Sequence, residues 1–346
     1  MKISKKNLLN AILAADAVAK SKTTLPILKS VRIEASKGTF TATGNSLDQY
    51  LIAHTECEGD MPACCVSARQ LAGIADLFGD DVEMSLDKQL KISSDYTLNV
   101  LDASQFPKTP DAKATKLGIP CADLKAAIQA VNFACHKNST FKTELYGVHV
   151  LGEAKSITAT ACNGRELAQN RKLVIAVPMD FTVWADFVDK FCEALGQDGA
   201  VLSVSENMAI VQYGGGEYGC KMNEAKFPNI KTITEQSRTE IGVINSDKWM
   251  PYFEAAVCMG GEDAKLNCRV LVSGERLEYV GNNGSISPMT PEKLGDGKQN
   301  LALNGATFTN CLNAFKGVPA KMYLMENTAI CVEAGDMKVI TTQLRQ

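Results

Sequence analysis

Gln105-Phe106-Pro107-Lys108 and Lys226-Phe227-Pro228-Asn229 are two versions of one short phrase. Their phenylalanines, Phe106 and Phe227, are 121 residues apart (227 − 106) in a chain of 346 residues. A motif that recurs at a long, fixed period is typical of a repeated structural unit. The spacing predicts three similar domains of roughly 115–120 residues, with one phrase at each link between them.

The segments on either side of the phrases repeat one order of elements: helix, strands, helix, strands. Apolar residues at helical spacing predict helices that begin near residues 5, 67, 121, 181, 247 and 305. Ser67 and Asn304 are predicted caps, and Trp184 is placed on the fourth helix. Pro251 has to lie in a first turn, which predicts that the fifth helix begins later than Ser246.

Strands with alternating polarity fill the remaining sequence, including hairpins around Lys37-Gly38 and Gly214-Gly215-Gly216. Antiparallel sheets with helices on one face define an α+β fold class. The predicted domains are residues 1–112, 113–235 and 236–346. Three such domains side by side would place six helices on one surface and the sheets on the other.

The composition predicts a soluble protein that does not bind nucleic acid indiscriminately. The net charge is −3, 22% of residues are charged, and 45% are apolar. No run of about 18 apolar residues is present, and the basic start leads into an amphipathic helix rather than a signal peptide. The 12 cysteines are scattered without a Cys-x-x-Cys pair, which is typical of reduced thiols in a cytoplasmic protein.

Signals for an enzyme or a cofactor are weak. Gly214-Gly215-Gly216 lacks the Lys-Ser/Thr that follows a phosphate-binding loop, and no Gly-x-Ser-x-Gly motif is present. The three histidines, His54, His136 and His149, stand apart from any cysteine pair. We therefore expect no catalytic residues, no metal site and no cofactor.

At this point the whole chain resembles the bacterial-type DNA sliding clamp, the beta subunit of replicative DNA polymerase. The stretches that carry the resemblance are Thr24-Leu25-Pro26-Ile27-Leu28, Leu145-Tyr146-Gly147-Val148, Ala159 to Ala168, Lys226-Phe227-Pro228 and the tail 339–345. The resemblance implies a head-to-tail homodimer whose six domains close into a ring, with helices lining the hole and sheets outside. Such a ring encircles duplex DNA without reading its sequence and tethers the polymerase, and it has no active site.

Several residues depart from the family pattern. Asn163 and Arg165 stand where the family has Asp and His, Glu166 replaces an Arg, and Thr341-Thr342-Gln343 makes the tail more polar. Because these changes gather where the family binds its partners, they fit a divergent clamp, such as one encoded by a phage, with an altered partner motif.

Lysines on and beside the helices are the predicted contacts to DNA phosphates, which are independent of sequence and sensitive to salt. Ordinary solvated helix faces also carry lysines, so this reading depends on the resemblance. The predicted DNA-facing residues are Lys5, Lys20, Lys22, Lys125, Lys137, Lys142, Lys190, Lys248 and Lys316.

The resemblance also implies a groove that captures linear peptides from the polymerase and the clamp loader. A small apolar cleft that takes a few side chains of a flexible tail is a common form of such recognition. The alternative is that the same residues are only core. The predicted pocket residues are Leu145, Cys162, Gly164, Arg165, Leu167, Pro228, Ile233, Ile340, Leu344 and Arg345.

Tyr96 and Leu98 alternate on a predicted edge strand, and an exposed edge invites pairing with another chain. By resemblance this edge meets Val257 and Cys258 of a second copy, and head-to-tail contacts that close form rings. Two other hypotheses remain: a monomeric clamp-like module that sequesters replication partners without encircling DNA, and an α+β enzyme built on the repeat.

Overall fold

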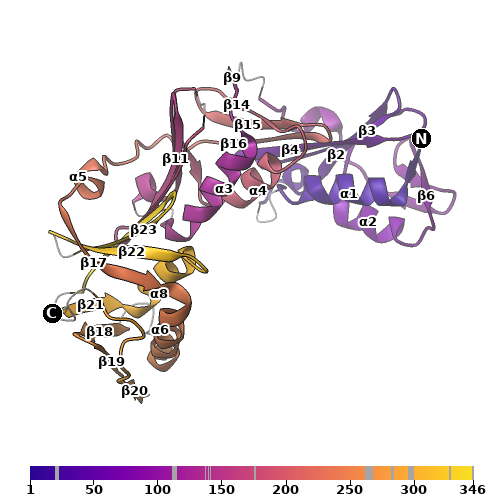
Figure 1. Ribbon diagram of the computed structural model, residues 1–346. Helices are drawn as coiled ribbons and strands as arrows, with labels where there is room; N and C mark the ends of the chain where they lie inside the picture. The colour runs from indigo at the N-terminus through magenta and orange to yellow at the C-terminus, as the bar shows by residue number, and fades with distance from the viewer. Residues whose placement is uncertain are drawn as a thin grey trace. The chain divides into compact units, whose positions relative to one another are not determined.

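The computed structural model describes the chain except residues 20–22, 111–114, 137, 139, 141, 175–176, 262–267, 282–283, 295–299, 327–328 and 345–346. The described residues form two compact units (Figure 1). Unit 1 comprises Met1–Ala122 and Asp189–Met222, and unit 2 comprises Asp123–Val188 and Asn223–Gln346. In the described part of the chain, no helix has the length and apolar character that crossing a membrane requires.

Unit 1 is built on an eight-stranded antiparallel sheet in the order β5-β2-β3-β4-β16-β15-β14-β9. A separate four-stranded sheet has the order β1-β6-β7-β8. The strands are β1 (Lys2–Ser4), β2 (Val31–Ser36), β3 (Thr39–Asn45), β4 (Gln49–Glu56), β5 (Met61–Val66), β6 (Asp81–Leu86), β7 (Leu90–Ile92), β8 (Tyr96–Leu98), β9 (Thr115–Leu117), β14 (Val201–Val204), β15 (Met208–Tyr213) and β16 (Gly216–Lys221).

Unit 2 repeats this plan with an eight-stranded sheet in the order β13-β10-β11-β12-β24-β23-β22-β17 and a four-stranded sheet in the order β20-β19-β18-β21. The strands are β10 (Gly147–Glu153), β11 (Ser156–Cys162), β12 (Glu166–Lys172), β13 (Met179–Trp184), β17 (Arg238–Asn245), β18 (Arg269–Ser273), β19 (Arg276–Gly281), β20 (Gly284–Ile286), β21 (Asn300–Asn304), β22 (Pro319–Met325), β23 (Ala329–Ala334) and β24 (Met337–Thr342).

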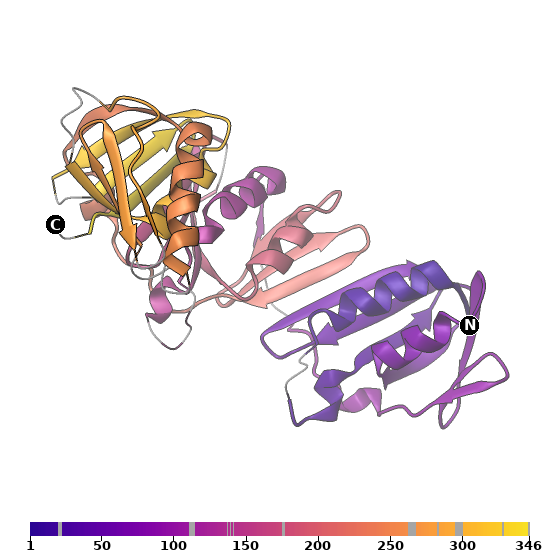
Figure 2. The same cartoon turned by 90° about the horizontal axis from the view of Figure 1, so that it is seen from below.

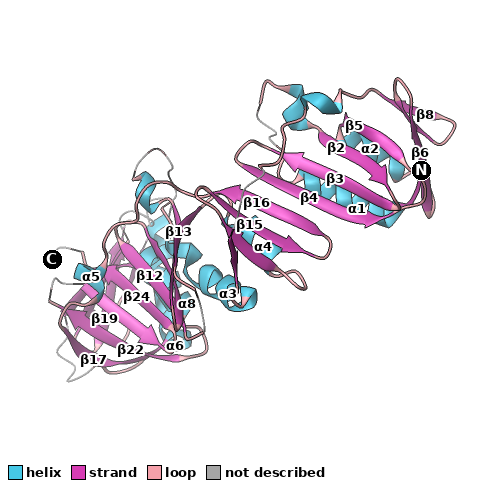
Figure 3. Cartoon of the chain, turned by 90° about the horizontal axis from the view of Figure 1, so that it is seen from above, coloured by secondary structure: helices cyan, strands magenta, loops and turns pink. Residues whose placement is uncertain are grey.

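The helices pack by their apolar stripes against one face of these sheets. Figure 2 shows α1 (Lys5–Asp16) and α2 (Ala68–Ala75) side by side in front of the strands. Figure 3 shows the opposite view, in which the strands lie in front of these two helices. In unit 2, Trp249 and Phe253 of α6 (Ser246–Gly260) and Phe308 of α8 (Gly305–Ala314) are fully buried. The remaining helices are α3 (Cys121–Val131), α4 (Val188–Leu195) and α5 (Lys231–Thr234), with short 3₁₀ turns η1 (Pro26–Lys29), η2 (Ala103–Gln105), η3 (Asn132–Ala134) and η4 (Thr143–Leu145).

The two eight-stranded sheets share one kind of junction. In unit 1, β4 pairs with β16, which places Tyr50 opposite Gly219. In unit 2, β12 pairs with β24, which places Leu167 opposite Ile340. The first junction is filled by the Tyr50 ring, because a Cβ on Gly219 would lie 2.3 Å from Tyr50 Cε1.

Most predicted elements are present. Ser67 and Asn304 cap α2 and α8 by accepting hydrogen bonds from the backbone N–H groups of Gln70 and Thr307. The hairpin at Lys37-Gly38 joins β2 to β3, and Gly214-Gly215 turns between β15 and β16.

Two helix predictions were wrong. Residues 179–184, including Trp184, form strand β13, which pairs with β10, and the helix begins only at Val188. Helix α6 begins at Ser246 and contains Pro251, so Pro251 is not in its first turn as predicted. The division into domains 1–112, 113–235 and 236–346 stays a prediction.

Candidate functional site

A row of apolar side chains crosses one face of the unit 2 sheet where β12 meets β24. Backbone register makes Leu167, Ile340, Cys331 and Tyr323 successive cross-strand neighbours on β12, β24, β23 and β22. Leu167, Ile340 and Cys331 are almost completely buried, and Met325 completes the cluster. We call these five residues the apolar row. Cys162 of β11, Ala329 and Ile230 are partly buried against it.

A tight turn, residues 163–166, closes one end of the apolar row. The side-chain oxygen of Asn163 accepts hydrogen bonds from the backbone N–H groups of Arg165 (2.9 Å) and Glu166 (3.0 Å). Asn163 also donates its amide to the Glu166 carboxylate at 2.9 Å. Gly164 adopts a left-handed backbone at φ 88°, which favours glycine. Asn163 and Glu166, two of the residues that depart from the pattern of the resemblance, therefore stabilise each other.

Lys142 lies at this turn. Its Nζ is 3.1 Å from the place that a Cβ on Gly164 would occupy. Burial raises the pKa of the Cys162 thiol, while a hydrogen bond from the Gly164 N–H and the positive charge of Lys142 act in the opposite direction. The side chain predicted to face DNA is thus positioned beside the candidate pocket.

A polar groove runs along the next row of the same sheet face. Because side chains on one face recur every second residue, the groove row contains Gln169, Lys338, Glu333 and Lys321. The groove has a volume of about 1050 Å³, and residues 227–231, 234 and 235 form its other side. Ile230 links the two features, because it lines the groove and also packs against the apolar row.

The Phe-Pro phrase is attached to the sheet at this groove. The Phe227 ring stacks on the His149 imidazole of β10, with ring centroids 4.6 Å apart and planes 3° apart. His149 Nδ1 also lies 3.3 Å from Thr182 Oγ1 and 3.7 Å from an Asp180 carboxylate oxygen. Burial lowers the pKa of His149, and the Asp180 charge opposes that shift.

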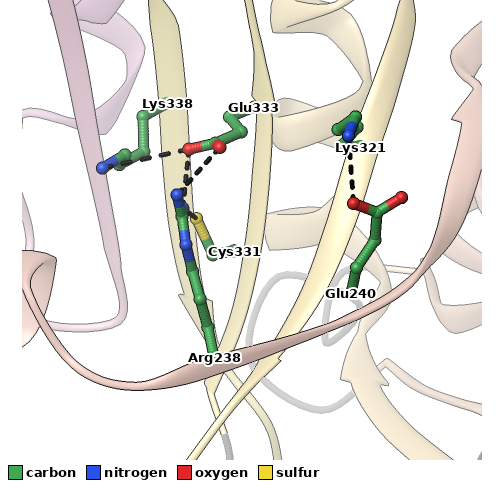
Figure 4. A network of polar contacts seen from close by, with 6 residues as sticks. All are labelled: Arg238, Glu240, Lys321, Cys331, Glu333 and Lys338. Carbon is green, nitrogen blue, oxygen red and sulfur yellow. Dashed lines mark hydrogen bonds and ion pairs between the residues drawn. The ribbon is translucent and has the colours of Figure 1, made fainter.

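A charged network borders the far end of the apolar row (Figure 4). The Arg238 guanidinium donates two hydrogen bonds to Glu333, at 2.6 and 2.9 Å, and one to Cys331 Sγ at 3.4 Å. It also lies over the Tyr323 ring, 4.3 Å from the ring centroid. The Glu333 pair raises the pKa of Arg238, and Lys321 pairs with Glu240 beside it at 3.0 Å. This planar pairing and stacking need an arginine.

The structure brings only part of the predicted pocket together. Cys162, Leu167 and Ile340 lie at the apolar row, and Gly164 and Arg165 form its end turn. Pro228 lines the polar groove instead. The others are spread around this core: Leu145 is buried in η4, Ile233 is 39% exposed on α5, and the Leu344 backbone donates to Ala302 of β21. Arg345 lies outside the described residues.

The predicted DNA-facing lysines are in several different environments. Lys5 donates to the Asp76 and Phe78 carbonyls at the end of α2, Lys190 pairs with Glu193, and Lys248 pairs with Glu292. Lys125 is on α3 and Lys316 is exposed after α8. Lys20, Lys22 and Lys137 lie outside the described residues.

The predicted seam residues lie at sheet and helix ends. Tyr96 and Leu98 are on β8, the edge strand of its sheet, and Tyr96 contacts the Phe78 ring edge-on. Val257 and Cys258 are on α6, and Cys258 is exposed. Within the described residues, no cluster of three His, Cys, Asp or Glu side chains could hold a metal ion.

Sequence reasoning missed Tyr323, Cys331 and Met325 as parts of the apolar row and Ile230 as a residue packed against it. Alternation on β22 and β23 marked these strands as half-buried, but only the pairing register shows that their side chains join Leu167 and Ile340. Arg238 and His149 were missed for the same reason, since their partners lie far away in the chain.

Comparison with known proteins relates this geometry to one family. Residues 1–110 match the family model described as "DNA polymerase III beta subunit, N-terminal domain". The beta sliding clamp of Salmonella typhimurium (strain LT2) is 21% identical over 349 aligned positions, covering 94% of this chain and 93% of its own. The chain is thus similar to beta sliding clamps over almost its whole length, at low sequence identity. The beta sliding clamp of Halalkalibacterium halodurans is 23% identical, with 86% and 82% of the two chains covered.

The sliding-clamp fold extends over the whole chain. The DNA polymerase III subunit beta from Pseudomonas aeruginosa matches with a TM-score of 0.90 at 16% identity, with 100% of both chains covered. The structure of the same organism's sliding clamp bound to griselimycin matches with a TM-score of 0.88 at 17% identity, covering 100% of this chain and 99% of that one. A sliding-clamp fold is therefore retained at low sequence identity.

Proposed function

We propose that the chain is a DNA polymerase processivity factor. Two copies close head to tail into a ring that encircles duplex DNA, slides without sequence specificity, and tethers the polymerase and the clamp loader through the apolar row and its groove. It acts in the cytoplasm and has no catalytic activity of its own. Its three domains are residues 1–112, 113–235 and 236–346.

The observation that carries this proposal is the pattern of sheet junctions. The half-sheets β5-β2-β3-β4, β13-β10-β11-β12 and β21-β18-β19-β20 share one topology. The half-sheets β16-β15-β14-β9, β24-β23-β22-β17 and β8-β7-β6-β1 share another. Two junctions, β4 with β16 and β12 with β24, join one half of each kind.

The third junction is missing within one chain. By equivalence it would join β20 to β8, and each of these is an edge strand among the described residues. An edge strand of one chain is a template for pairing with another, so we assign this junction to the seam between two copies. Met259 of α6 lies against Gly284 of β20, with its sulfur 3.4 Å from a Cβ built there, so the proposed contacts Val257 and Cys258 are near this edge.

The helices supply the surface that faces DNA in this proposal. Lys125, Lys190, Lys248 and Lys316 are on or directly after helices. Because Lys190 and Lys248 are paired with carboxylates, their attraction to phosphates is moderated, which favours weak contacts and sliding.

The apolar row supplies the partner site. Its buried floor is flanked by the partly exposed side chains of Tyr323, Cys162 and Ile230, and the polar groove continues it along the strands. A linear peptide would place apolar anchors on the row and its flanking residues in the groove. Griselimycin is the bound molecule in one sliding-clamp relative, which makes it a suitable probe.

The seam is tested by solution mass and by charge pairing. We expect the wild-type chain at micromolar concentration to have about twice its mass of 37.2 kDa. Tyr96→Asp on β8 or Ile286→Lys on β20 should each shift the mass toward that of the monomer. The double variant should recover dimer, because one strand of each proposed seam then carries an Asp and the other a Lys. Leu13→Lys, an exposed change on α1, is the control. A monomeric wild type, or single variants that remain fully dimeric, would contradict the proposal.

Encirclement is tested with a linear duplex whose ends are blocked after the protein has been added. A ring threaded onto the duplex should stay on it through gel filtration in high salt, and should leave after the duplex is cut in the middle. Equal loss from blocked and unblocked duplex would favour the monomeric module instead. The seam double variant should behave as the wild type, and the single variants should be lost from both.

A further inference from the structure

A second cavity lies on the opposite, helix-covered face of the unit 2 sheet. It has a volume of about 450 Å³, opens to solvent, and is lined by residues of α3, η3, α8, β12 and β24. Four carboxamides line it, together with the Phe133 ring and the Met337 thioether. The carboxamides are those of Gln129, Asn170, Asn310 and Asn313. Neither the apolar row nor the polar groove uses them.

Asn170 is the buried polar group of this cavity. Its side chain is 6% exposed, and its amide nitrogen makes only a long contact of 3.8 Å to the sulfur of Met337, its cross-strand neighbour. Its Oδ1 has no hydrogen-bond partner in the described part of the chain. A buried acceptor without a donor destabilises a fold. A bound molecule that donates a hydrogen bond to Asn170 Oδ1 would remove that cost.

The fold itself does not require an amide at this position. Register makes Ala53 the equivalent of Asn170 at the unit 1 junction, where it faces Gly216. The same sheet junction therefore forms with an alanine and a glycine. Asn170 and Met337 add polar and polarizable atoms where the equivalent site in unit 1 has none.

The lining chemistry favours a neutral, planar ligand with adjacent donors and acceptors. The described residues that line the cavity include no charged side chain, which disfavours phosphates and carboxylates as its occupants. Asn and Gln carboxamides pair with the N6 amino group and N7 of adenine, and an aromatic ring offers a stacking surface for a base. A volume of about 450 Å³ is within the range of small-molecule sites.

We propose that this cavity binds an adenine base, with Asn170 as the recognition residue at its floor. The base could come from a free nucleoside or from an unpaired position of single-stranded DNA. The second source rests on the proposed function, in which the helices face DNA. Binding needs the Asn170 side chain to turn toward the cavity, because its Oδ1 is buried in this structure. That oxygen then accepts from the adenine N6 amino group, with Gln129, Asn310 and Asn313 at the mouth.

The test uses the full-length chain and saturation-transfer NMR with four probes: adenosine, uridine, and single strands of oligo-dA and oligo-dT. We expect transfer to adenosine or to oligo-dA, and affinity at least about tenfold lower for the matching pyrimidine probe. Adenosine alone would identify a free nucleoside as the source, and oligo-dA alone would identify DNA. No transfer to either at millimolar concentration, or equal affinity for purine and pyrimidine, would overturn the proposal.

Two variants locate the site. Asn170→Leu should lower affinity by about tenfold or more while leaving the melting temperature equal or higher, because it removes the unsatisfied acceptor. Ala314→Trp should abolish binding by filling the cavity, and carries the test if Asn170→Leu fails to fold. Asn207→Leu, an exposed amide on unit 1, is the matched control. Unchanged affinity in either cavity variant would overturn the assignment.

Discussion

The imidazole of His149 lies flat on the Phe227 ring. This contact attaches the segment that begins at Phe227 to strand β10 of the unit 2 sheet. Only a neutral ring is well accommodated there, since burial lowers the pKa of His149 despite the nearby Asp180. A protonated imidazole would have to give up its hydration to stay buried in the stack, which costs free energy. The contact therefore couples attachment of residues 227–235 to pH.

The pH dependence of stability tests this coupling. Because the folded-state pKa of His149 is lowered, the unfolded chain binds more protons below about pH 6.5 than the folded chain does. The free energy of unfolding should fall as pH drops from about 6.5 toward the folded-state pKa and level off below it. His149→Phe, which keeps a ring for the stack, should reduce this slope, measured by urea titration at several pH values.

His54→Phe is the matched control, because His54 is exposed on β4. Measured alongside, it separates an effect of the His149–Phe227 stack from the effect of removing any histidine. An identical slope in wild type and His149→Phe would show that His149 does not contribute to the pH dependence.

Arg238 contributes through shape as much as through charge. It combines a bidentate pair with Glu333, a contact to Cys331 and a position over the Tyr323 ring. Arg238→Lys keeps the charge but loses the second hydrogen bond and the planar stack. We expect the free energy of unfolding to fall by about 0.5–1.5 kcal/mol, since the pair is partly exposed. Lys172→Arg, in a single-point pair with Asp336, should change it by less than about 0.5 kcal/mol.

The pairing of strands, at the scale of elements, decides what each sheet junction can hold. At the unit 1 junction, Tyr50 is buried over Gly219 and its hydroxyl donates to Glu217 at 2.6 Å. Desolvation and this hydrogen bond raise the pKa of Tyr50, so the ring stays neutral. At the unit 2 junction, Leu167 and Ile340 leave room for Ile230 to pack from above.

Gly219→Ala tests this arrangement. The added methyl would lie 2.3 Å from Tyr50 Cε1, so we expect the free energy of unfolding to fall by about 1–3 kcal/mol. Tyr50→Ala in the same chain should remove the clash, so the double variant should lose less than the sum of the two single variants. Strictly additive losses would contradict the packing, and thermal or urea unfolding of all four proteins measures it.

The apolar row is tested at the same scale by substitution at its edge. Ile230→Asp places a charge against the row without altering a strand, and should weaken griselimycin binding by at least about tenfold. Leu344→Asp should weaken it as well if the tail closes the site. Leu13→Asp, at an exposed apolar side chain on α1, is the matched control, and the dimer mass should stay unchanged in all three.

Griselimycin binding that is equal in wild type and Ile230→Asp would place the partner site elsewhere. Isothermal titration calorimetry measures both affinity and stoichiometry. A loss in Ile230→Asp with none in Leu344→Asp would limit the site to the apolar row and exclude the tail.

How far the sequence predicts these elements depends on whether the information is local. Ser67 and Asn304 were readable as caps, and Lys37-Gly38 as a turn, because each acts on neighbours in the chain. Trp184 was misplaced because Phe181, Val183 and Trp184 favour a strand as strongly as a helix face, and pairing with β10 decides the outcome. Leu167 and Ile340 were predicted at the site through the resemblance, whereas Tyr323 and Cys331 required the register of β22 to β24.

At the scale of the whole molecule, the proposed ring separates two kinds of attachment to DNA. Phosphate contacts by lysines weaken steeply as salt rises. Encirclement does not depend on salt as long as the seam stays closed. We therefore expect binding to an open linear duplex to be lost between about 50 and 500 mM salt, while retention on an end-blocked duplex persists.

That difference is measured by the same gel filtration at several salt concentrations. A parallel loss from both duplexes, with the dimer intact, would contradict encirclement. Dissociation of the dimer over this range would instead locate the salt sensitivity in the seam.

The Tyr50 side chain limits how many partners can bind the proposed two-chain ring at one time. Since it fills the unit 1 junction, the described residues of that junction form no apolar row like the one in unit 2, and a ring of two chains has two unit 2 rows. Partners that use the same row must then take turns or share the ring one per subunit. The exchange of a loader for a polymerase would depend on how long each stays bound at the two equivalent sites. A third partner could bind only after one of them had dissociated.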